Sequence, residues 1–355
     1  MLAIAALIGG ILFQQSNNSS NELPKMSKAI ILPNPKPLTG VEFIDHTGNP
    51  FTKEQLMGRW SIVFFGFTNC PDICPSTMHL LKQVKQNLSD AGKWGNYQVM
   101  MITVDPERDS SELLGKYVPY FDPEFIGLRN NLDATTEFAK QLGILFVSHQ
   151  KEGQENYEVD HGASIILINP NAEMAGVISA PHKLDEISGD LILLADHFKD
   201  DHKVVKETAI ATAEKSAPVI DTSIDSTTQK TQQQSLTISS SWIRPAPPNA
   251  PAMAAYFDLY NHTDTDIVIT DSDSDSFGMT MIHDTVIEDG VAKMLHLDSL
   301  TIPANSSVSL KPMAKHMMLM QAEDSLEIGD TIDITLVSES GETFDYSIEV
   351  KPQPE

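Results

Sequence analysis

The chain has 355 residues and a formal net charge of −25 at pH 7, with 49 acidic and 24 basic side chains. Such an acidic balance argues against nucleic acid or acidic lipid as a partner. An apolar content of 41% is enough for real hydrophobic cores, and the length predicts two or three domains.

The N-terminus begins with an unbroken apolar run from Met1 to Phe13. Its thirteen residues fall short of the roughly 20 that a membrane-spanning helix needs. The run also lacks the basic residues and the cleavage motif of a signal peptide.

The only two cysteines, Cys70 and Cys74, stand four residues apart in the segment FTNCPDICP. The apolar run 62–67 before them predicts a buried strand, and a helical pattern follows from Ser76 to Leu88. A strand, a dithiol and a helix in this order are typical of a thioredoxin-like site. The N-terminus of the helix would stabilise a thiolate there.

The cysteine spacing favours metal binding over dithiol exchange. Redox dithiols of this fold usually have C-x-x-C, whereas Cys70 and Cys74 form C-x-x-x-C. His161 precedes the apolar run 165–168 and is the candidate third ligand, facing the cysteines. A structural disulfide and a thiol peroxidase are the alternatives for the cysteines, and a hydrogen-bonded core histidine is the alternative for His161.

Residues 60–198 alternate apolar and helical patterns, which predicts an α/β domain. We expect further strands at 98–104, 125–128 and 163–168, and helices at 110–120, 133–142 and 184–198.

Residues 34–199 resemble the Sco/SenC family of membrane-tethered copper proteins. The matching motifs are CPDICP at 70–75, TVDPERD at 103–109 and VDH at 159–161. The resemblance implies a thioredoxin-like fold and one copper, Cu(I) or Cu(II), bound by Cys70, Cys74 and His161. It also implies a role in assembling the copper-A centre of cytochrome c oxidase, or a thiol reductase role toward the same target.

Because this family usually carries one N-terminal anchor helix, we expect residues 1–33 to hold a truncated membrane anchor and a tether. The rest of the chain would then face the periplasm. An ordinary buried segment is the alternative for the apolar run. Residues 200–235 are poor in aromatic residues and rich in Lys, Thr, Ser, Gln and Glu, which predicts a flexible linker.

Residues 236–355 show short alternating segments separated by Asp, Asn, Gly and Pro, which predicts an all-β sandwich. We expect strands at 254–260, 267–270, 308–311 and 331–337. Eight of the fifteen methionines follow residue 250, close to histidines. Thioethers suit Cu(I) and stay competent as ligands in an oxidising compartment.

This region resembles the PCuAC class of periplasmic copper chaperones. His283, Met294, His316 and Met318 follow the class pattern of His, ten residues, Met, twenty-one residues, His-x-Met. The resemblance implies a cupredoxin-like sandwich that binds Cu(I) through these four side chains. The methionine that often follows the first histidine is replaced by Thr285. For each methionine taken alone, core packing is the alternative.

The sequence therefore predicts a fused copper metallochaperone in which the C-terminal domain captures Cu(I). The N-terminal domain would deliver copper to the copper-A subunit of the oxidase by ligand exchange, without catalytic turnover. Other periplasmic copper carriers are the expected further partners. The competing hypothesis is a thiol-disulfide oxidoreductase that keeps the oxidase cysteines reduced.

Overall fold

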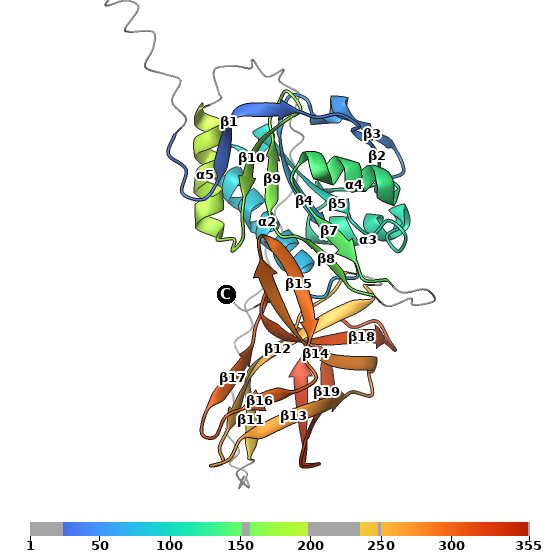
Figure 1. The fold of residues 1–355 in the computed structure, drawn as a ribbon, viewed down its shortest axis with the longest axis vertical. Coiled ribbons are helices and arrows are strands. Elements are labelled where there is room, and N and C mark those ends of the chain that lie inside the picture. The colour runs from blue at the N-terminus through green and yellow to red at the C-terminus, as the bar shows by residue number, and fades with distance from the viewer. Residues whose placement is uncertain (1–23, 151–156, 198–234, 248–249, 354–355) are drawn as a thin grey trace, which may run out of the picture.

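The computed structural model describes residues 24–150, 157–197, 235–247 and 250–353. An α/β domain lies above a β domain in Figure 1. Residues 1–23 of the predicted anchor and tether at 1–33, and residues 200–234 of the predicted linker at 200–235, fall outside these residues. No helix among the described residues is long and apolar enough to cross a membrane.

The N-terminal domain is built on a mixed sheet of eight strands in the order β1-β10-β9-β4-β5-β6-β2-β3. The strands β4, β5 and β6 run parallel, and all seven residues of β4 are buried, as befits a central strand. The strands are β1 (Ile30–Pro37), β2 (Glu42–Asp45), β3 (Pro50–Thr52), β4 (Trp60–Gly66), β5 (Tyr97–Thr103), β6 (Ile126–Arg129), β9 (Ile165–Ile168) and β10 (Glu173–Ile178).

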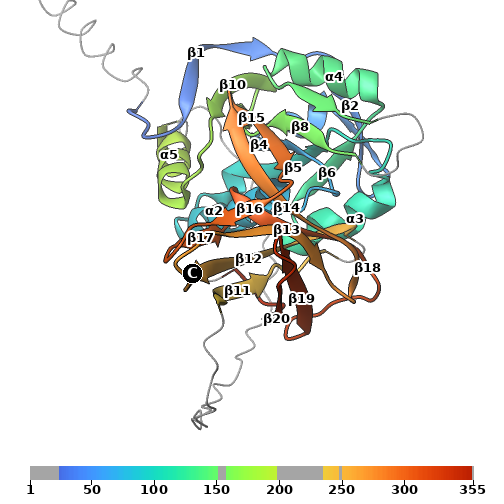
Figure 2. The ribbon, with the colours of Figure 1, turned by 60° about the horizontal axis from the view of Figure 1, so that its bottom comes forward.

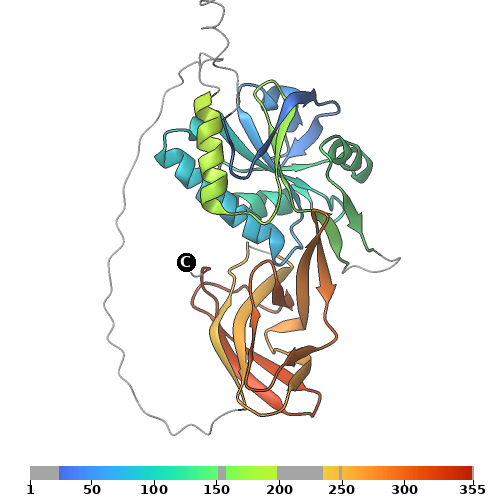
Figure 3. The same cartoon turned by 60° about the vertical axis from the view of Figure 1, so that its left-hand side comes forward.

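Helices pack against this sheet and complete the predicted thioredoxin-like fold. The helices are α2 (Ile73–Asp90), α3 (Ser111–Phe121), α4 (Leu132–Gln141) and α5 (Leu184–His197), with short 3₁₀ turns η1 (Lys53–Leu56) and η2 (Trp94–Asn96). In α2, buried Cys74, Met78, Leu81 and Leu88 recur at spacings of three, four and seven, so that one face meets the core. Figure 3 shows α2 and α5 side by side.

The C-terminal domain is a β sandwich, as predicted. One layer contains β11 (Leu236–Ile243), β12 (Ala252–Asn261), β14 (Phe277–Glu288), β15 (Val291–His296), β17 (Ser307–Leu310) and β18 (Lys315–Ala322). The other contains β13 (Ile267–Asp273), β16 (Leu300–Ile302), β19 (Thr331–Ser338) and β20 (Thr343–Glu349). Ile282 and Met317 from the first layer share one core with Leu336 and Phe344 from the second.

The first layer of the sandwich continues into the N-terminal domain, an arrangement that the sequence did not predict. Two strands of that domain, β7 (Phe146–Ser148) and β8 (Val159–Gly162), extend the sheet to the order β11-β12-β18-β14-β15-β8-β7. In the pairing of β15 with β8, Ala292 lies opposite His161. The backbone N–H of Ala163 also donates to the carbonyl of Gly290 (2.9 Å). Figures 1 and 2 show the β14–β15 hairpin reaching the α/β domain.

Candidate metal centres

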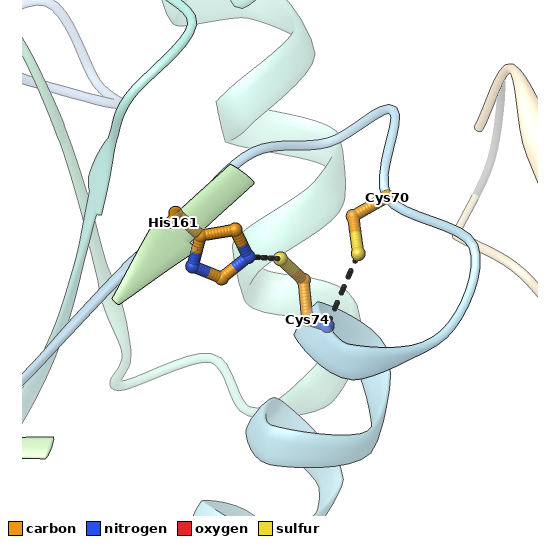
Figure 4. Close-up of side chains that lie close together, drawn as sticks. All are labelled: Cys70, Cys74 and His161. Carbon is orange, nitrogen blue, oxygen red and sulfur yellow. Dashed lines mark hydrogen bonds between the residues drawn. The ribbon is translucent and has the colours of Figure 1, made fainter. Parts of the chain in front are cut away.

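The first candidate centre joins the loop before α2, the first turn of α2 and strand β8. Cys70 lies in the loop, Cys74 is the second residue of α2 and His161 is in β8; all three are buried. Their Sγ and ring nitrogen atoms lie within 4.8 Å of one another, the only such His, Cys, Asp and Glu group among the described residues. Figure 4 shows the His161 ring pointing at Cys74.

Hydrogen bonds orient the sulfur and nitrogen atoms that could bind a metal. The backbone N–H of Cys74, at the start of α2, donates to Sγ of Cys70 (3.4 Å), and Nε2 of His161 lies 3.5 Å from Sγ of Cys74. Nδ1 of His161 lies 3.2 Å from the carbonyl of Gly162. When Nδ1 carries the proton and donates it there, Nε2 is left as the ligand atom.

The two thiols are inequivalent. Burial by itself raises the pKa of Cys70, but hydrogen bonds with Cys74 and His161 outweigh it and bring this pKa well below its usual range. Burial and the neighbouring Cys70 raise the pKa of Cys74 well above its usual range. Cys70 is therefore the first thiolate of the pair. Both cysteines are free, so the predicted alternative of a structural disulfide is not what the structure shows.

Close packing holds the dithiol in place. The rings of Phe64 and Phe67 pack against the His161 ring in T-shaped pairs, with ring centroids 5.7 and 5.8 Å away. A Cβ atom on Gly66 would lie 2.9 Å from Sγ of Cys74 and 2.7 Å from the Phe64 ring. The end of β4 therefore needs glycine to leave room for the sulfur.

The TVDPERD motif forms hydrogen bonds to the segments that carry the ligands of the first centre, a role that the sequence did not reveal. The carboxylate of Asp109 accepts hydrogen bonds from the hydroxyls of Thr68 (2.6 Å) and Thr103 (2.6 Å), which fixes the loop that carries Cys70. Asp105 accepts a hydrogen bond from the Tyr157 hydroxyl (2.7 Å), four residues before His161. The motif thus positions both the loop and the segment that leads into β8.

The second candidate centre lies on three neighbouring strands of the β domain. In the antiparallel registers, His283 of β14 lies opposite His316 of β18, and Met281 lies opposite Met318. Met294 of β15 lies opposite Thr285 of β14. Because opposed residues share a face and alternate residues return to it, the four predicted ligands lie on one face of the sheet. Met317 faces the sandwich core instead.

Both predicted histidine ligands carry a buried ring nitrogen without a hydrogen-bond partner. Nδ1 of His316 lies 3.0 Å from the carbonyl of Ala314, and its Nε2 is unpartnered. For His283 it is Nδ1 that is unpartnered, while Nε2 lies 3.2 Å from a carboxylate oxygen of Glu158. Buried polar atoms are normally hydrogen-bonded, so these two nitrogens fit a metal as the missing partner.

A cavity of about 400 Å³ opens beside this centre, between the two domains. The β domain contributes the ligand-type side chains Met279, Met281, His283, Met294, His296, Met318 and Met320. The N-terminal domain contributes Phe67, Asn69, His149, Tyr157 and Glu158. Sequence reasoning did not find Glu158, because nothing in the sequence brings it to His283.

A thioredoxin-like domain with a Cys/Cys/His cluster, joined to a β sandwich with a His/Met cluster, defines a class of soft-metal-binding proteins. The model of the SCO1/SenC family matches residues 37–195, and that of the LpqE-like lipoprotein family matches residues 236–350. The chain belongs to the SCO1/SenC family and carries a C-terminal domain of the PCuAC type.

Curated relatives support this membership. A protein of Stutzerimonas stutzeri named "Putative copper-binding protein" is 36% identical over 177 residues, which are 50% of this chain and 86% of the relative. The mitochondrial SCO1 homolog of Mus musculus is 32% identical over 202 residues, 56% of this chain and 71% of the relative.

Solved structures match each domain separately. Copper-bound ScoI of Arabidopsis thaliana has a TM-score of 0.41 and 27% identity, and the match covers 46% of this chain and 98% of that structure. The copper-bound PCuAC domain from PmoF2 has a TM-score of 0.29 and 19% identity, and covers 34% of this chain and 95% of that domain.

Proposed function

We propose that this protein is a copper carrier with two sites, one in each domain. Cys70, Cys74 and His161 would form the N-terminal site, and His283, Met294, His316 and Met318 the C-terminal site. Two thiolates with one imidazole, and two thioethers with two imidazoles, are soft donor sets that suit copper, the second set Cu(I) in particular. The copper named in the first relative above agrees with this assignment.

One observation carries the proposal that copper passes between the sites. Strand β8, which holds His161, pairs directly with β15, which holds Met294. His161 lies opposite Ala292, and Ala292 and Met294 are alternate residues of one strand. His161 and Met294 therefore lie on the same face of one continuous sheet. Copper captured by the β domain would move by ligand exchange to the dithiol.

We further propose that the protein works outside the cytoplasm, tethered to a membrane by its N-terminal segment. Its final acceptor would be the copper-A subunit of cytochrome c oxidase, with other periplasmic copper carriers as donors. The support is the family membership, since proteins of the SCO1/SenC family act in the assembly of the copper centre of cytochrome oxidase.

X-ray absorption of the reduced full chain, loaded with one and then two equivalents of copper, tests the two-site proposal. We expect Cu–S scattering from thiolates that disappears in Cys70→Ser with Cys74→Ser, while the thioether signal persists. His161→Ala should weaken copper binding without removing the Cu–S signal. Thiolate scattering that survives the double cysteine variant would rule out the N-terminal site.

The inequivalence of the two thiols favours a second candidate function, a thiol-disulfide oxidoreductase. The Cys70 thiolate would attack a disulfide of the target, releasing one target thiolate and forming a mixed disulfide. Cys74 would then attack Cys70, lose its proton and release the second target thiolate. The target gains two electrons, and the protein is left with a Cys70–Cys74 disulfide. Stoichiometric reduction of an oxidised copper-A domain by metal-free protein would establish this role, and its absence would exclude it.

A further inference from the structure

Asp72, between the two cysteines of the CPDIC motif, has a fully buried side chain. It occupies the N-cap position of α2, where an aspartate normally accepts hydrogen bonds from the first turn of its own helix. Here no such side-chain bond forms. From the described residues of its own domain, the carboxylate receives only a long hydrogen bond, from Ser76 Oγ (3.4 Å). The usual structural role of an N-cap aspartate therefore does not account for Asp72.

The other hydrogen bonds to the Asp72 carboxylate come from the C-terminal domain. Oδ1 accepts from the Tyr256 hydroxyl (2.9 Å), and Oδ2 accepts from the Thr285 hydroxyl (3.0 Å) and the backbone N–H of Met313 (2.8 Å). Arg244 donates from Nη1 to the carbonyl of Asp72 (3.0 Å) and lies 3.7 Å from its carboxylate. Met313 adopts the left-handed conformation (φ 61°), which few side chains favour.

These contacts act together as one recognition site. Burying a carboxylate is costly unless hydrogen bonds replace those it makes to water. On the C-terminal domain, three hydrogen-bond donors and one guanidinium group replace them. The donors come from four separate segments, around residues 244, 256, 285 and 313. These segments come together only in the folded sandwich. There they form a binding pocket for one acidic side chain.

Docking at Asp72 also closes the space above the dithiol. A cavity between Cys70 and C-terminal-domain residues that include Arg244 and Ala254 has a volume of about 10 Å³, room for about one water molecule. Cys70 is 2% exposed and Cys74 is fully buried. Figure 3 shows this end of α2 against the β domain.

We propose that Asp72 is the docking residue through which the C-terminal domain of the same chain covers the dithiol. The surface around Asp72 is then occupied in the docked state. An external protein that reaches Cys70 and Cys74 has to displace the C-terminal domain first. All of these contacts form in a structure without metal, and Nδ1 of the proposed copper ligand His316 lies 3.7 Å from Oδ2 of Asp72. Docking is therefore tested on reduced, metal-free protein, separately from the proposed copper function.

Thr285→Asp is the sharpest test, because it places a second carboxylate against Asp72 without replacing any residue of the dithiol loop. We expect the domains to separate, so that iodoacetamide alkylates the cysteines about tenfold faster or more, the size expected for disrupting hydrogen bonds to a buried charge. Small-angle scattering should show a larger radius of gyration. Asp72→Asn combined with Thr285→Asp should restore the compact scattering profile, because an asparagine amide can donate to the new aspartate.

A second variant removes other hydrogen-bond donors to Asp72. It tests the same contact if Thr285→Asp fails to fold. Arg244→Gln with Tyr256→Phe removes one guanidinium and one hydroxyl, and should also speed alkylation and expand the molecule. Tyr260→Phe is the matched control, since the Tyr260 hydroxyl makes only a long bond (3.4 Å) to Asn305 within its own domain. Wild-type alkylation and scattering in the folded variants, or no rescue by Asp72→Asn, would overturn the proposal.

Discussion

Asp109 is buried beneath the dithiol loop, where its carboxylate is costly to ionise. Burial raises its pKa from 3.8 to about 6, although hydrogen bonds from Thr103 and Thr68 work in the opposite direction. Because the folded-state pKa is raised, this residue contributes stability that is fully present below pH 3.8 and is lost as the pH rises through about 6.

We therefore predict that Asp109→Asn changes the pH dependence of stability. The difference in unfolding free energy between wild type and variant should shift by about 3 kcal/mol in favour of wild type on going from pH 7 to pH 3.5. Denaturant unfolding of the reduced, metal-free wild type and variant at several pH values measures this difference in unfolding free energy. A difference that stays constant with pH would show that Asp109 ionises normally.

The second prediction at this scale concerns the thioether ligands. Met294→Leu with Met318→Leu roughly preserves side-chain volume, so the unfolding free energy should change by about 1.5 kcal/mol or less per site. Cu(I) affinity of the C-terminal site should fall on the order of a hundredfold or more, since even residues behind metal ligands contribute ten- to hundredfold. Competition with a Cu(I) chelator measures the affinity.

Met317→Leu is the matched control for this pair. It makes the same chemical change next to Met318 on β18, but Met317 faces the sandwich core. Its Cu(I) affinity should equal that of wild type. Equal affinities in the control and the double variant would remove the methionines from the site.

At the scale of elements, the hairpin of β14 and β15 joins the two domains. Its two-residue loop is Asp289-Gly290, with φ values of 51° and 80°, as a tight hairpin of this kind requires. The loop brings the Gly290 carbonyl to the backbone N–H of Ala163, beside His161. The turn therefore fixes where the β domain meets β8.

We predict that Gly290→Ala weakens this junction. A Cβ there meets no atom within 4 Å, so the cost is conformational, about 1–2 kcal/mol for a left-handed residue. The amide of Ala163 should then exchange its hydrogen faster. Gly341→Ala is the control, because Gly341 has a similar φ of 83° and equal space, but lies in the turn between β19 and β20. If both variants left Ala163 equally protected, the hairpin loop would not hold the junction.

For the whole molecule, the docked arrangement would make the proposed copper transfer an intramolecular step. We predict that copper loaded on the C-terminal domain reaches Cys70 and Cys74 at a rate independent of protein concentration. Tethering sets an effective concentration on the order of millimolar. Cleavage at an engineered protease site near Gln232 should make transfer slower and concentration-dependent at low micromolar protein. Stopped-flow spectroscopy of the copper–thiolate bands would follow it.

A cleaved chain that transfers copper as fast as the intact one at low micromolar concentration would contradict this prediction. The linker would then serve only to keep the two domains in the same place. Scattering on the same samples would show whether the cleaved halves stay docked.

The sequence by itself determined both fold classes and both candidate ligand clusters. Hydrophobic periodicity identifies strands and helices because it reflects which face each element buries, and the element bounds differ from the predicted ones by a few residues. The helix expected from Ser76 begins at Ile73, because Pro75 lies in the first turn, where its missing N–H costs nothing. The spacing of the cysteines, histidines and methionines identified both candidate ligand clusters, because all the residues of each cluster belong to one domain.

Only the tertiary structure decided how the two domains meet. Periodicity gives the face of a strand but not its partner, so nothing in the sequence predicted that β8 pairs with β15 or that His161 lies opposite Ala292. The same is true of Asp72, which stands at the N-cap position of α2. Its carboxylate is instead bound by Tyr256, Thr285 and Met313, because three-dimensional packing, and not proximity in the sequence, selects the donors of a buried charge.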